Sequence, residues 1–258
     1  YYTSFALRSL AILGLLDGPL AERCAGFLHG RLQGQETIVD LLSLVYSAKL
    51  IEAASGVDPF KMARSGWSQR LAELLAGLRR DDGGYSKSWE GRVGSTYQTF
   101  LVLLCLELIE QPCPRADEVQ AFLMRQRQDD GGFLEVRVGK RSGTNPTAAA
   151  LGSLRILGRL ESQIASDAAE FLCELQDESG GFQANTRIPL PDLLSTFTAC
   201  VTLADIDRLA DVSTAQVERY VLSMQQPAGG FRGFEFDPAD DIEYTFYGLG
   251  ALALLRTV

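Results

Sequence analysis

The sequence predicts an all-α protein of the α/α toroid class, for two reasons. First, four Gly-Gly pairs recur at spacings of 48, 49 and 49 residues, each followed at once by an aromatic residue. A fixed period of this length indicates a repeat in which each unit is one supersecondary element. Second, strongly apolar helices alternate with amphipathic ones, and no convincing strand pattern interrupts them. The pairs and their aromatic residues are Gly83-Gly84-Tyr85, Gly131-Gly132-Phe133, Gly180-Gly181-Phe182 and Gly229-Gly230-Phe231.

The helices follow from the same register. Amphipathic helices are expected near 19–31, 66–79, 115–128, 163–176 and 213–226, and the paired glycines, which adopt left-handed backbone readily, are expected to end four of them. Six strongly apolar helices are expected between them. Four of these are marked by a threonine, at spacings of 51, 49 and 49: Thr96, Thr147, Thr196 and Thr245.

The first ninety residues are predicted to hold two degenerate copies of the repeat. Tyr2-Thr3-Ser4-Phe5 matches 244–247, and Asp40-Leu41-Leu42-Ser43 matches 192–195. Six apolar helices with at least five amphipathic ones fit a ring with an inner wall around a central cavity and an outer shell facing water. We therefore expect residues 1–258 to form a single toroid domain that lacks one outer helix at its N-terminal end.

Composition narrows the function classes. With 24 Lys and Arg against 33 Asp and Glu, the 258-residue chain has a net charge of −9 and lacks the basic surface that nucleic-acid binding requires. No apolar stretch approaches the roughly 20 residues that span a bilayer. The five cysteines show no CxxC spacing and are expected to be reduced, which favours a cytoplasmic protein.

The repeat resembles that of a known superfamily. The patterns Gln176-x-x-x-Gly180-x-Phe182 and Gln225-x-x-x-Gly229-x-Phe231 are similar to the repeat shared by protein prenyltransferase β subunits and squalene-hopene-type terpenoid cyclases. The resemblance covers nearly the whole chain. It implies an isoprenoid ligand of the prenyl diphosphate type in the central cavity and a helical α-subunit-like partner.

The prenyltransferase zinc set is incomplete in this sequence. Asp192 matches the family's zinc Asp, but Leu194 stands at the zinc Cys position and Tyr244 at the zinc His position. The only histidine, His29, lies far from this register. We therefore expect no metal site and no zinc, with Mg²⁺ as a possible cofactor only of a diphosphate substrate. Arg187 is the nearby candidate for binding a diphosphate, while Lys87, Arg92, Arg137, Lys140 and Arg141 occupy equivalent loops.

The cyclase resemblance points to a different acid. Class II cyclases protonate their substrate with the middle Asp of an Asp-x-Asp-Asp-Thr motif, and 241–245 places Glu243 at that position. Asp240 and Asp241 are close enough in sequence to raise the pKa of Glu243. The alternative is an ordinary acidic helix start, which the helix dipole favours. The candidate catalytic set is therefore Glu243, Asp241, Asp240 and Asp192.

Aromatic residues near the starts of the apolar helices are candidates for lining an isoprenoid site. Their π faces can stabilise positive charge, and an apolar cavity suits a prenyl chain. Each of them can equally be an ordinary core residue. The candidate substrate-binding residues are Tyr97, Phe197, Tyr244, Tyr247 and Arg187.

The predicted function is that of a prenyltransferase β-subunit-like toroid that binds an isoprenoid without the usual zinc ligands. Whether it is a transferase, a cyclase or no enzyme is left open. The alternatives are a class II terpene cyclase with Glu243 as proton donor and a non-catalytic toroid that binds a lipid or a protein. A glycoside hydrolase or lyase that pairs Asp192 with Glu243 is a further alternative.

Overall fold

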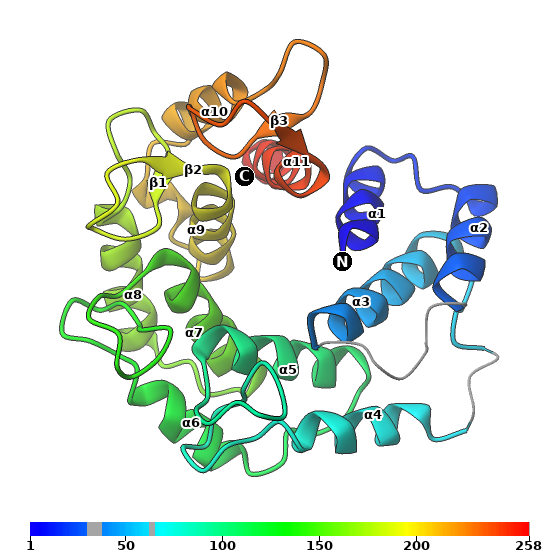
Figure 1. Ribbon diagram of the computed structural model, residues 1–258. Coiled ribbons are helices and arrows are strands. Elements are labelled where there is room, and N and C mark those ends of the chain that lie inside the picture. The colour runs from blue at the N-terminus through cyan, green and yellow to red at the C-terminus, as the bar shows by residue number, and fades with distance from the viewer. Residues whose placement is uncertain (30–37, 62–64, 258) are drawn as a thin grey trace. The chain divides into compact units, whose positions relative to one another are not determined.

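The computed structural model describes residues 1–29, 38–61 and 65–257, and the chain is mostly helical (Figure 1). The strongly apolar set of helices is α1 (Tyr2–Ile12), α3 (Ile38–Ser55), α5 (Thr96–Leu108), α7 (Thr144–Ile156), α9 (Leu193–Asp205) and α11 (Ile242–Thr257). The other set is α2 (Gly18–His29), α4 (Trp67–Ala76), α6 (Ala116–Met124), α8 (Ser162–Glu174) and α10 (Thr214–Ser223). The predicted six and five helices are thus all found within the described residues. His29 ends α2, and its side chain lies outside the described part.

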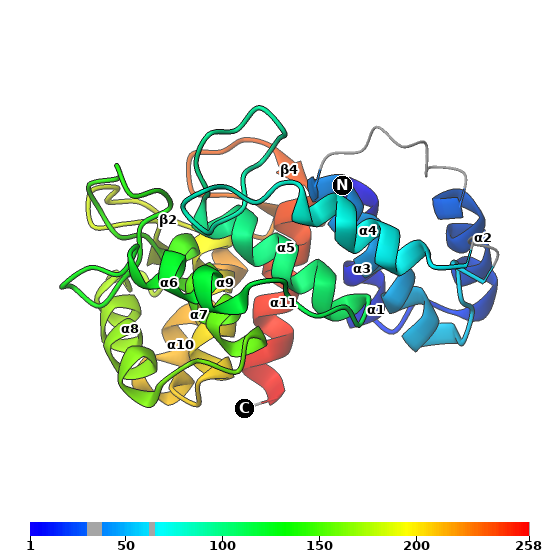
Figure 2. The same cartoon turned by 90° about the horizontal axis from the view of Figure 1, so that it is seen from below.

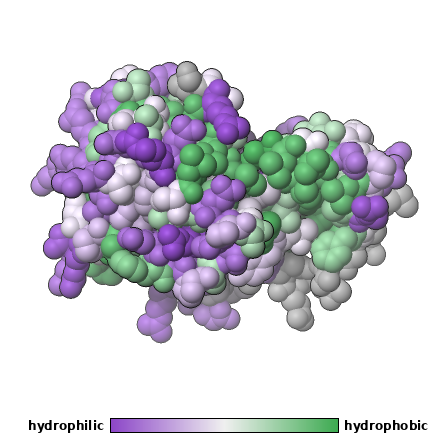
Figure 3. Space-filling view, turned by 90° about the horizontal axis from the view of Figure 1, so that it is seen from above, coloured by the Kyte–Doolittle hydropathy of each residue, from purple (hydrophilic) through white to green (hydrophobic). Residues whose placement is uncertain are grey.

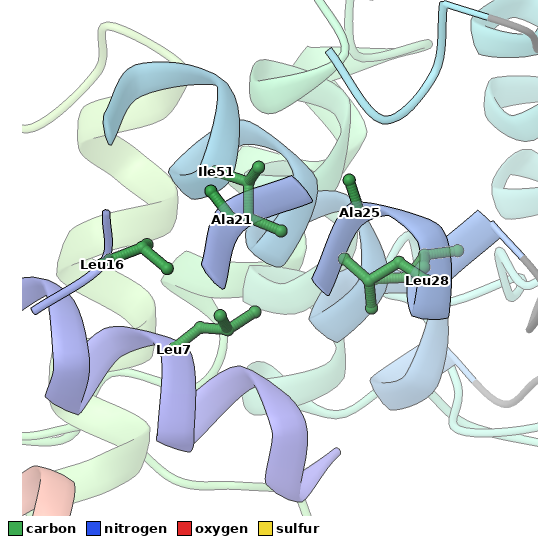
Figure 4. Packing of buried hydrophobic residues seen from close by; sticks show 7 residues of the cluster. Leu7, Leu16, Ala21, Ala25, Leu28 and Ile51 are labelled. Atoms are coloured by element: carbon green, nitrogen blue, oxygen red, sulfur yellow. The ribbon is translucent and has the colours of Figure 1, made fainter. Parts of the chain in front are cut away.

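The chain divides into two compact units, here called the N-terminal unit (Tyr1–Val119) and the C-terminal unit (Gln120–Val258). In the N-terminal unit, α3 packs against α1, α2 and α5. Leu7 of α1, Ala21 and Leu28 of α2 and Ile51 of α3 meet in one buried cluster (Figure 4). This cluster removes the apolar faces of three helices from water, which is the main source of their stability.

In the C-terminal unit, α9 packs between α7 and α11 (Figures 1 and 2). Helices α8 and α10 cover this row, α8 against α7 and α9, and α10 against α11. The described residues of this unit also form a 3₁₀ turn (Leu209–Asp211) and two short antiparallel ladders. These pair β1 (Phe182–Gln183) with β2 (Pro191–Asp192), and β3 (Phe231–Arg232) with β4 (Asp240–Asp241).

Each repeat is held together by a threonine hydroxyl. In the third copy, Thr196 Oγ1 accepts a hydrogen bond from the Phe182 N–H at 3.0 Å and donates to the Asp192 carbonyl at 2.7 Å. The same contact to the aromatic residue is made by Thr99, Thr147 and Thr245. The prediction that Thr96 begins this column is therefore wrong, because Thr99 is the residue that bonds the Tyr85 N–H. With Thr99 the spacings become 48, 49 and 49, identical to those of the glycine pairs.

The glycine pairs form tight turns and do not end the helices. The first glycine of each pair has positive φ, as expected, with Gly180 at 96°. However, α8 already ends at Glu174, and Gln176 then bridges to Phe182 across the turn. The paired glycines therefore reverse the chain beyond the helix end, which corrects the prediction that they end the amphipathic helices.

All five cysteines are free thiols. Among the described residues, no helix is long and apolar enough to cross a membrane. Hydrophobic residues nevertheless reach the surface, as Figure 3 shows for one face of the molecule. Large exposed apolar side chains include Tyr2 and Leu13 in the N-terminal unit and Val138 and Phe236 in the C-terminal unit.

Candidate functional site

The candidate site lies at the N-terminal ends of α9 and α11. Asp192 is the N-cap of α9, where its Oδ1 accepts from the Ser195 N–H at 2.7 Å and its Oδ2 from the Ser195 hydroxyl at 2.9 Å. These bonds satisfy an otherwise unpaired donor of the first helical turn. Burial nevertheless raises the pKa of Asp192, against the opposing effect of the Ser195 and Leu194 hydrogen bonds. Asp192 is therefore protonated more readily than an ordinary surface aspartate.

The two helix ends are tied together by backbone. The Leu193 N–H at the start of α9 donates to the Gly233 carbonyl at 2.8 Å, in the segment that leads toward α11. Asp241 begins α11 in the same way as Asp192 begins α9, since its Oδ1 accepts from the Tyr244 N–H at 2.8 Å. The carboxyl groups of Asp192 and Asp241 are thus capping groups first, as the alternative interpretation of the acidic helix start predicted.

Tyr244 lies between the two ends. Its ring stacks over Gly233, where an added Cβ would stand 2.5 Å from the Tyr244 Cζ, so a residue without a side chain is required there. Burial raises the pKa of Tyr244, and the carboxylates of Asp192 and Glu243 raise it further. The structure therefore brings Tyr244 and Asp192 together, as the sequence register implied.

Glu243 is held by its own helix. The Tyr247 hydroxyl, one turn further along α11, donates to Glu243 Oε1 at 2.9 Å. Around it, the ring of Phe197 on α9 lies 5.2 Å from that of Phe246 and 5.5 Å from that of Tyr247, centroid to centroid. Phe246 and Tyr247 are buried and Phe197 is half-buried. A carboxyl group therefore stands at the edge of an aromatic cluster formed by two neighbouring helices.

Three candidate residues do not join this group. Asp240 is exposed in β4. Arg187 is exposed in the loop between β1 and β2. The cations named from the sequence in the equivalent loops of other repeats are exposed as well. Tyr97 is 41% exposed and belongs to α5 in the N-terminal unit. The candidate set in the C-terminal unit therefore reduces to Asp192, Glu243 and Tyr244 with the aromatic cluster.

The N-terminal unit has a cavity of its own, of about 340 Å³. Asp40, which the sequence aligned with Asp192, lies in its wall together with Tyr1, Thr3, Ser4, Phe27, Leu28, Ser43, Leu44 and Ser47. The cavity wall is thus a mixture of a carboxyl group, hydroxyl groups and apolar side chains, and it includes the aromatic rings of Tyr1 and Phe27.

The residues at the three zinc positions offer only one good ligand, the carboxyl of Asp192, because Leu194 binds no metal and burial raises the pKa of the Tyr244 phenol. Among the described residues no group of three or more His, Cys, Asp or Glu could hold a metal ion. Burial also raises the pKa of the Cys200 thiol on α9 to about 12, so this cysteine is not a thiolate at neutral pH.

The sequence analysis missed Tyr220 on α10. Its side chain is 5% exposed, and its ring lies against Gly181 of the glycine-pair turn, close to Pro191, the residue before Asp192. The repeat contained the signal, because Phe122 and Phe171 stand 98 and 49 residues before Tyr220. A hydroxyl group is thus added at a position that is phenylalanine in the two preceding copies and Leu74 in the first.

Comparison with known proteins identifies the family of this chain. The family model described as the prenyltransferase alpha-alpha toroid domain matches residues 45–146 and 144–258. The chain therefore belongs to the prenyltransferase alpha-alpha toroid family, and the fold predicted from the repeat is confirmed.

One relative belongs to the prenyltransferase branch named from the sequence. Geranylgeranyl transferase type-2 subunit beta of Saccharomyces cerevisiae is 26% identical over 137 residues, which are 52% of this chain and 42% of that protein. The match thus spans less than half of the relative's length.

Two solved structures share the fold. Candida albicans protein geranylgeranyltransferase-I, complexed with GGPP, has a TM-score of 0.82 at 16% identity and covers 98% of this chain and 83% of its own. A type II terpene cyclase from Scytonema, in complex with its substrate geranylgeranyl dihydroxybenzoate, has a TM-score of 0.63 at 14% identity and covers 99% and 86%. At these identities the likeness concerns the fold.

Proposed function

We propose that the C-terminal unit binds an isoprenoid ligand at the starts of α9 and α11, as a prenyltransferase β-subunit-like domain without the usual zinc ligands. The observation that carries the proposal is the aromatic cluster of Phe197, Phe246 and Tyr247 beside two carboxyl-bearing helix ends. Aromatic faces favour the apolar chain and any positive charge that develops on it. The two structural neighbours support the proposal because each was solved with a geranylgeranyl compound.

The ligand type proposed is a prenyl diphosphate. Its diphosphate group is proposed to bind near Arg187 in the loop between β1 and β2, where Mg²⁺ would bind only together with the diphosphate. The chain is proposed to work with a helical α-subunit-like partner, since its yeast relative is named a beta subunit. Native mass spectrometry of the protein from its source tests both, because one spectrum reports subunits, metals and bound ligand. A stoichiometric zinc would contradict the proposed loss of the zinc set.

Binding is tested by titration with geranylgeranyl diphosphate. Phe197→Leu reduces the aromatic surface at α9 and should weaken binding, because the leucine keeps apolar volume but loses the ring. Phe122→Leu is the matched control, since it makes the same change on α6. Equal affinity of wild type and Phe197→Leu would place the ligand elsewhere.

A second candidate function is acid-initiated cyclisation with Glu243 as the proton donor. It is favoured by one contact, the 2.9 Å hydrogen bond from Tyr247 that fixes Glu243 at the edge of the aromatic cluster. Glu243→Gln should then abolish product from an unphosphorylated polyprene while leaving its affinity unchanged. If neither a polyprene nor a prenyl diphosphate is turned over but one of them binds, the domain is a non-catalytic isoprenoid-binding toroid.

A further inference from the structure

Tyr220 carries a buried hydroxyl group that no described residue satisfies. The residue is 5% exposed, and its hydroxyl oxygen has no hydrogen-bond partner. A buried polar group without a partner costs about 1–3 kcal/mol, so such a group is normally retained for a reason. A bound molecule that reached this hydroxyl would supply its missing partner.

The ring of Tyr220 lies close to the start of α9, near Pro191. An added Cβ on Gly181 would stand 2.7 Å from the Tyr220 Cζ and 2.7 Å from the Pro191 Cβ. The carbon that bears the hydroxyl thus lies beside Pro191, the residue before Asp192. Burial raises the pKa of Tyr220, and the Asp192 carboxylate is the largest of the charges that raise it further. The two groups are neighbours at the same helix start.

The preceding repeat shows the same packing without either polar group. There an added Cβ on Gly132 would stand 2.8 Å from the Phe171 ring and 2.6 Å from the Ser142 Cβ, and the next residue is Gly143. Between these two repeats Phe171 becomes Tyr220, and Gly143 becomes Asp192, at one place in the fold. Relative to the preceding repeat, the phenol and the carboxyl group are thus gained together.

The charges around this pair select the group that fits. The charged side chains that act on Tyr220 are the acidic Asp192, Asp177 and Glu235 and one cation, Arg232. Such an acidic surrounding opposes a diphosphate oxygen, which carries negative charge and no proton to donate. A neutral hydroxyl group suits it, because it can donate to the carboxyl group and accept from the phenol.

We propose that Tyr220 and Asp192 form a subsite for one neutral hydroxyl group of the bound molecule. The hydroxyl donates to the Asp192 carboxyl and accepts from Tyr220. It belongs either to an isoprenoid alcohol or to a separate acceptor alcohol or phenol that binds beside a prenyl group. This inference depends on the proposed function only where the hydroxyl group belongs to an isoprenoid or binds beside one.

The test compares each hydroxyl compound with its methyl ether, which cannot donate. Geranylgeraniol is compared with geranylgeranyl methyl ether, and phenol with anisole in the absence of any isoprenoid. At least one hydroxyl compound should bind about three- to tenfold more tightly than its ether, the range expected for one net hydrogen bond. The pair that shows the preference identifies the source of the hydroxyl. If each hydroxyl compound and its ether bind alike, there is no such subsite.

Two variants assign the preference to these residues. Tyr220→Phe restores the phenylalanine of the two preceding repeats, and Asp192→Ser installs the capping residue that Ser95 provides in α5. Each should remove the preference for the hydroxyl compound. Tyr220→Phe should not lower the urea midpoint of unfolding, because the oxygen that it removes has no partner in the protein.

Tyr85→Phe is the matched control, because it removes the hydroxyl of a fully buried tyrosine in the N-terminal unit. It should leave the preference intact. A preference that survives Tyr220→Phe, or that Tyr85→Phe removes equally, would overturn the subsite. If phenol shows the preference but no prenyl compound binds, the proposed isoprenoid function fails and the subsite stands.

Discussion

Replacing Thr196 with valine tests the hydrogen bond that organises each repeat. Valine keeps the shape and branching of threonine, so the change removes only the hydroxyl of a fully buried residue. The buried Phe182 N–H then loses its acceptor, at a cost of about 1–3 kcal/mol, and the bond to the Asp192 carbonyl is lost at about 0.5–1.5 kcal/mol. We expect the free energy of unfolding to fall by about 2–4 kcal/mol.

Urea unfolding followed by circular dichroism measures this loss. Thr202→Val on the same helix is the matched control, because the Thr202 hydroxyl only donates to the Thr198 carbonyl, one turn earlier in α9. Its removal should change stability by less than about 1 kcal/mol. If Thr196→Val is no more destabilising than Thr202→Val, the threonine column does not hold the repeat together.

Three further predictions concern ionisation, backbone and thiol chemistry. Burial raises the pKa of Asp192, so its contribution to stability is full below the ordinary aspartate pKa and is lost as pH rises through the raised pKa. In urea unfolding, Asp192→Asn should therefore be as stable as wild type near about pH 3 and more stable than wild type at pH 7. The same stability difference at both pH values would contradict this. Gly180→Ala should destabilise the protein more than Gly229→Ala. Both glycines have φ near 95°, but only a Cβ at 180 would clash with the backbone of Gln216, at 2.4 Å. Equal midpoints of thermal unfolding for the two variants would argue against the clash. Cys200 should react with a thiol reagent at pH 7 only on the time scale of unfolding, because burial raises its pKa to about 12. Rapid labelling of Cys200, detected by peptide mass spectrometry, would show this to be wrong.

The sequence predicted the helices well because its strongest signals were periodic. Apolar spacing and the glycine pairs repeat with one period, so each copy supports the others, and all six apolar and five amphipathic helices were found among the described residues. The errors came from local chemistry. Thr96 and Thr99 both lie near the expected position in the first copy, and only the hydrogen bond from the Tyr85 N–H identifies Thr99 as the equivalent residue.

The candidate site was predicted in part. The register set Tyr244 and Asp192 at the starts of neighbouring apolar helices, and the Asp192 carboxylate does raise the pKa of Tyr244. Arg187 and Asp240 were chosen by their distance along the chain, and loop conformation leaves both exposed. Tyr220 was missed because it lies on an amphipathic helix, where an aromatic residue is ordinarily only a packing residue.

The repeat supplies an internal reference that separates scaffold from function. The threonine recurs in four copies, where its hydroxyl accepts from the N–H of the aromatic residue, and in three of them it also donates to the carbonyl four residues earlier. A residue without a hydroxyl group would leave these backbone groups unpaired. Four residues before it, however, the copies carry Ser95, Gly143, Asp192 and Asp241. A position whose backbone role is constant while its side chain changes from none to a carboxyl group is not under a packing constraint. Carboxyl groups stand there in Asp192 and Asp241, and also in Asp40 of the earlier copy that matches 192–195. The binding site is proposed at α9 and α11 because only there do such carboxyl groups stand beside the aromatic cluster of Phe197, Phe246 and Tyr247.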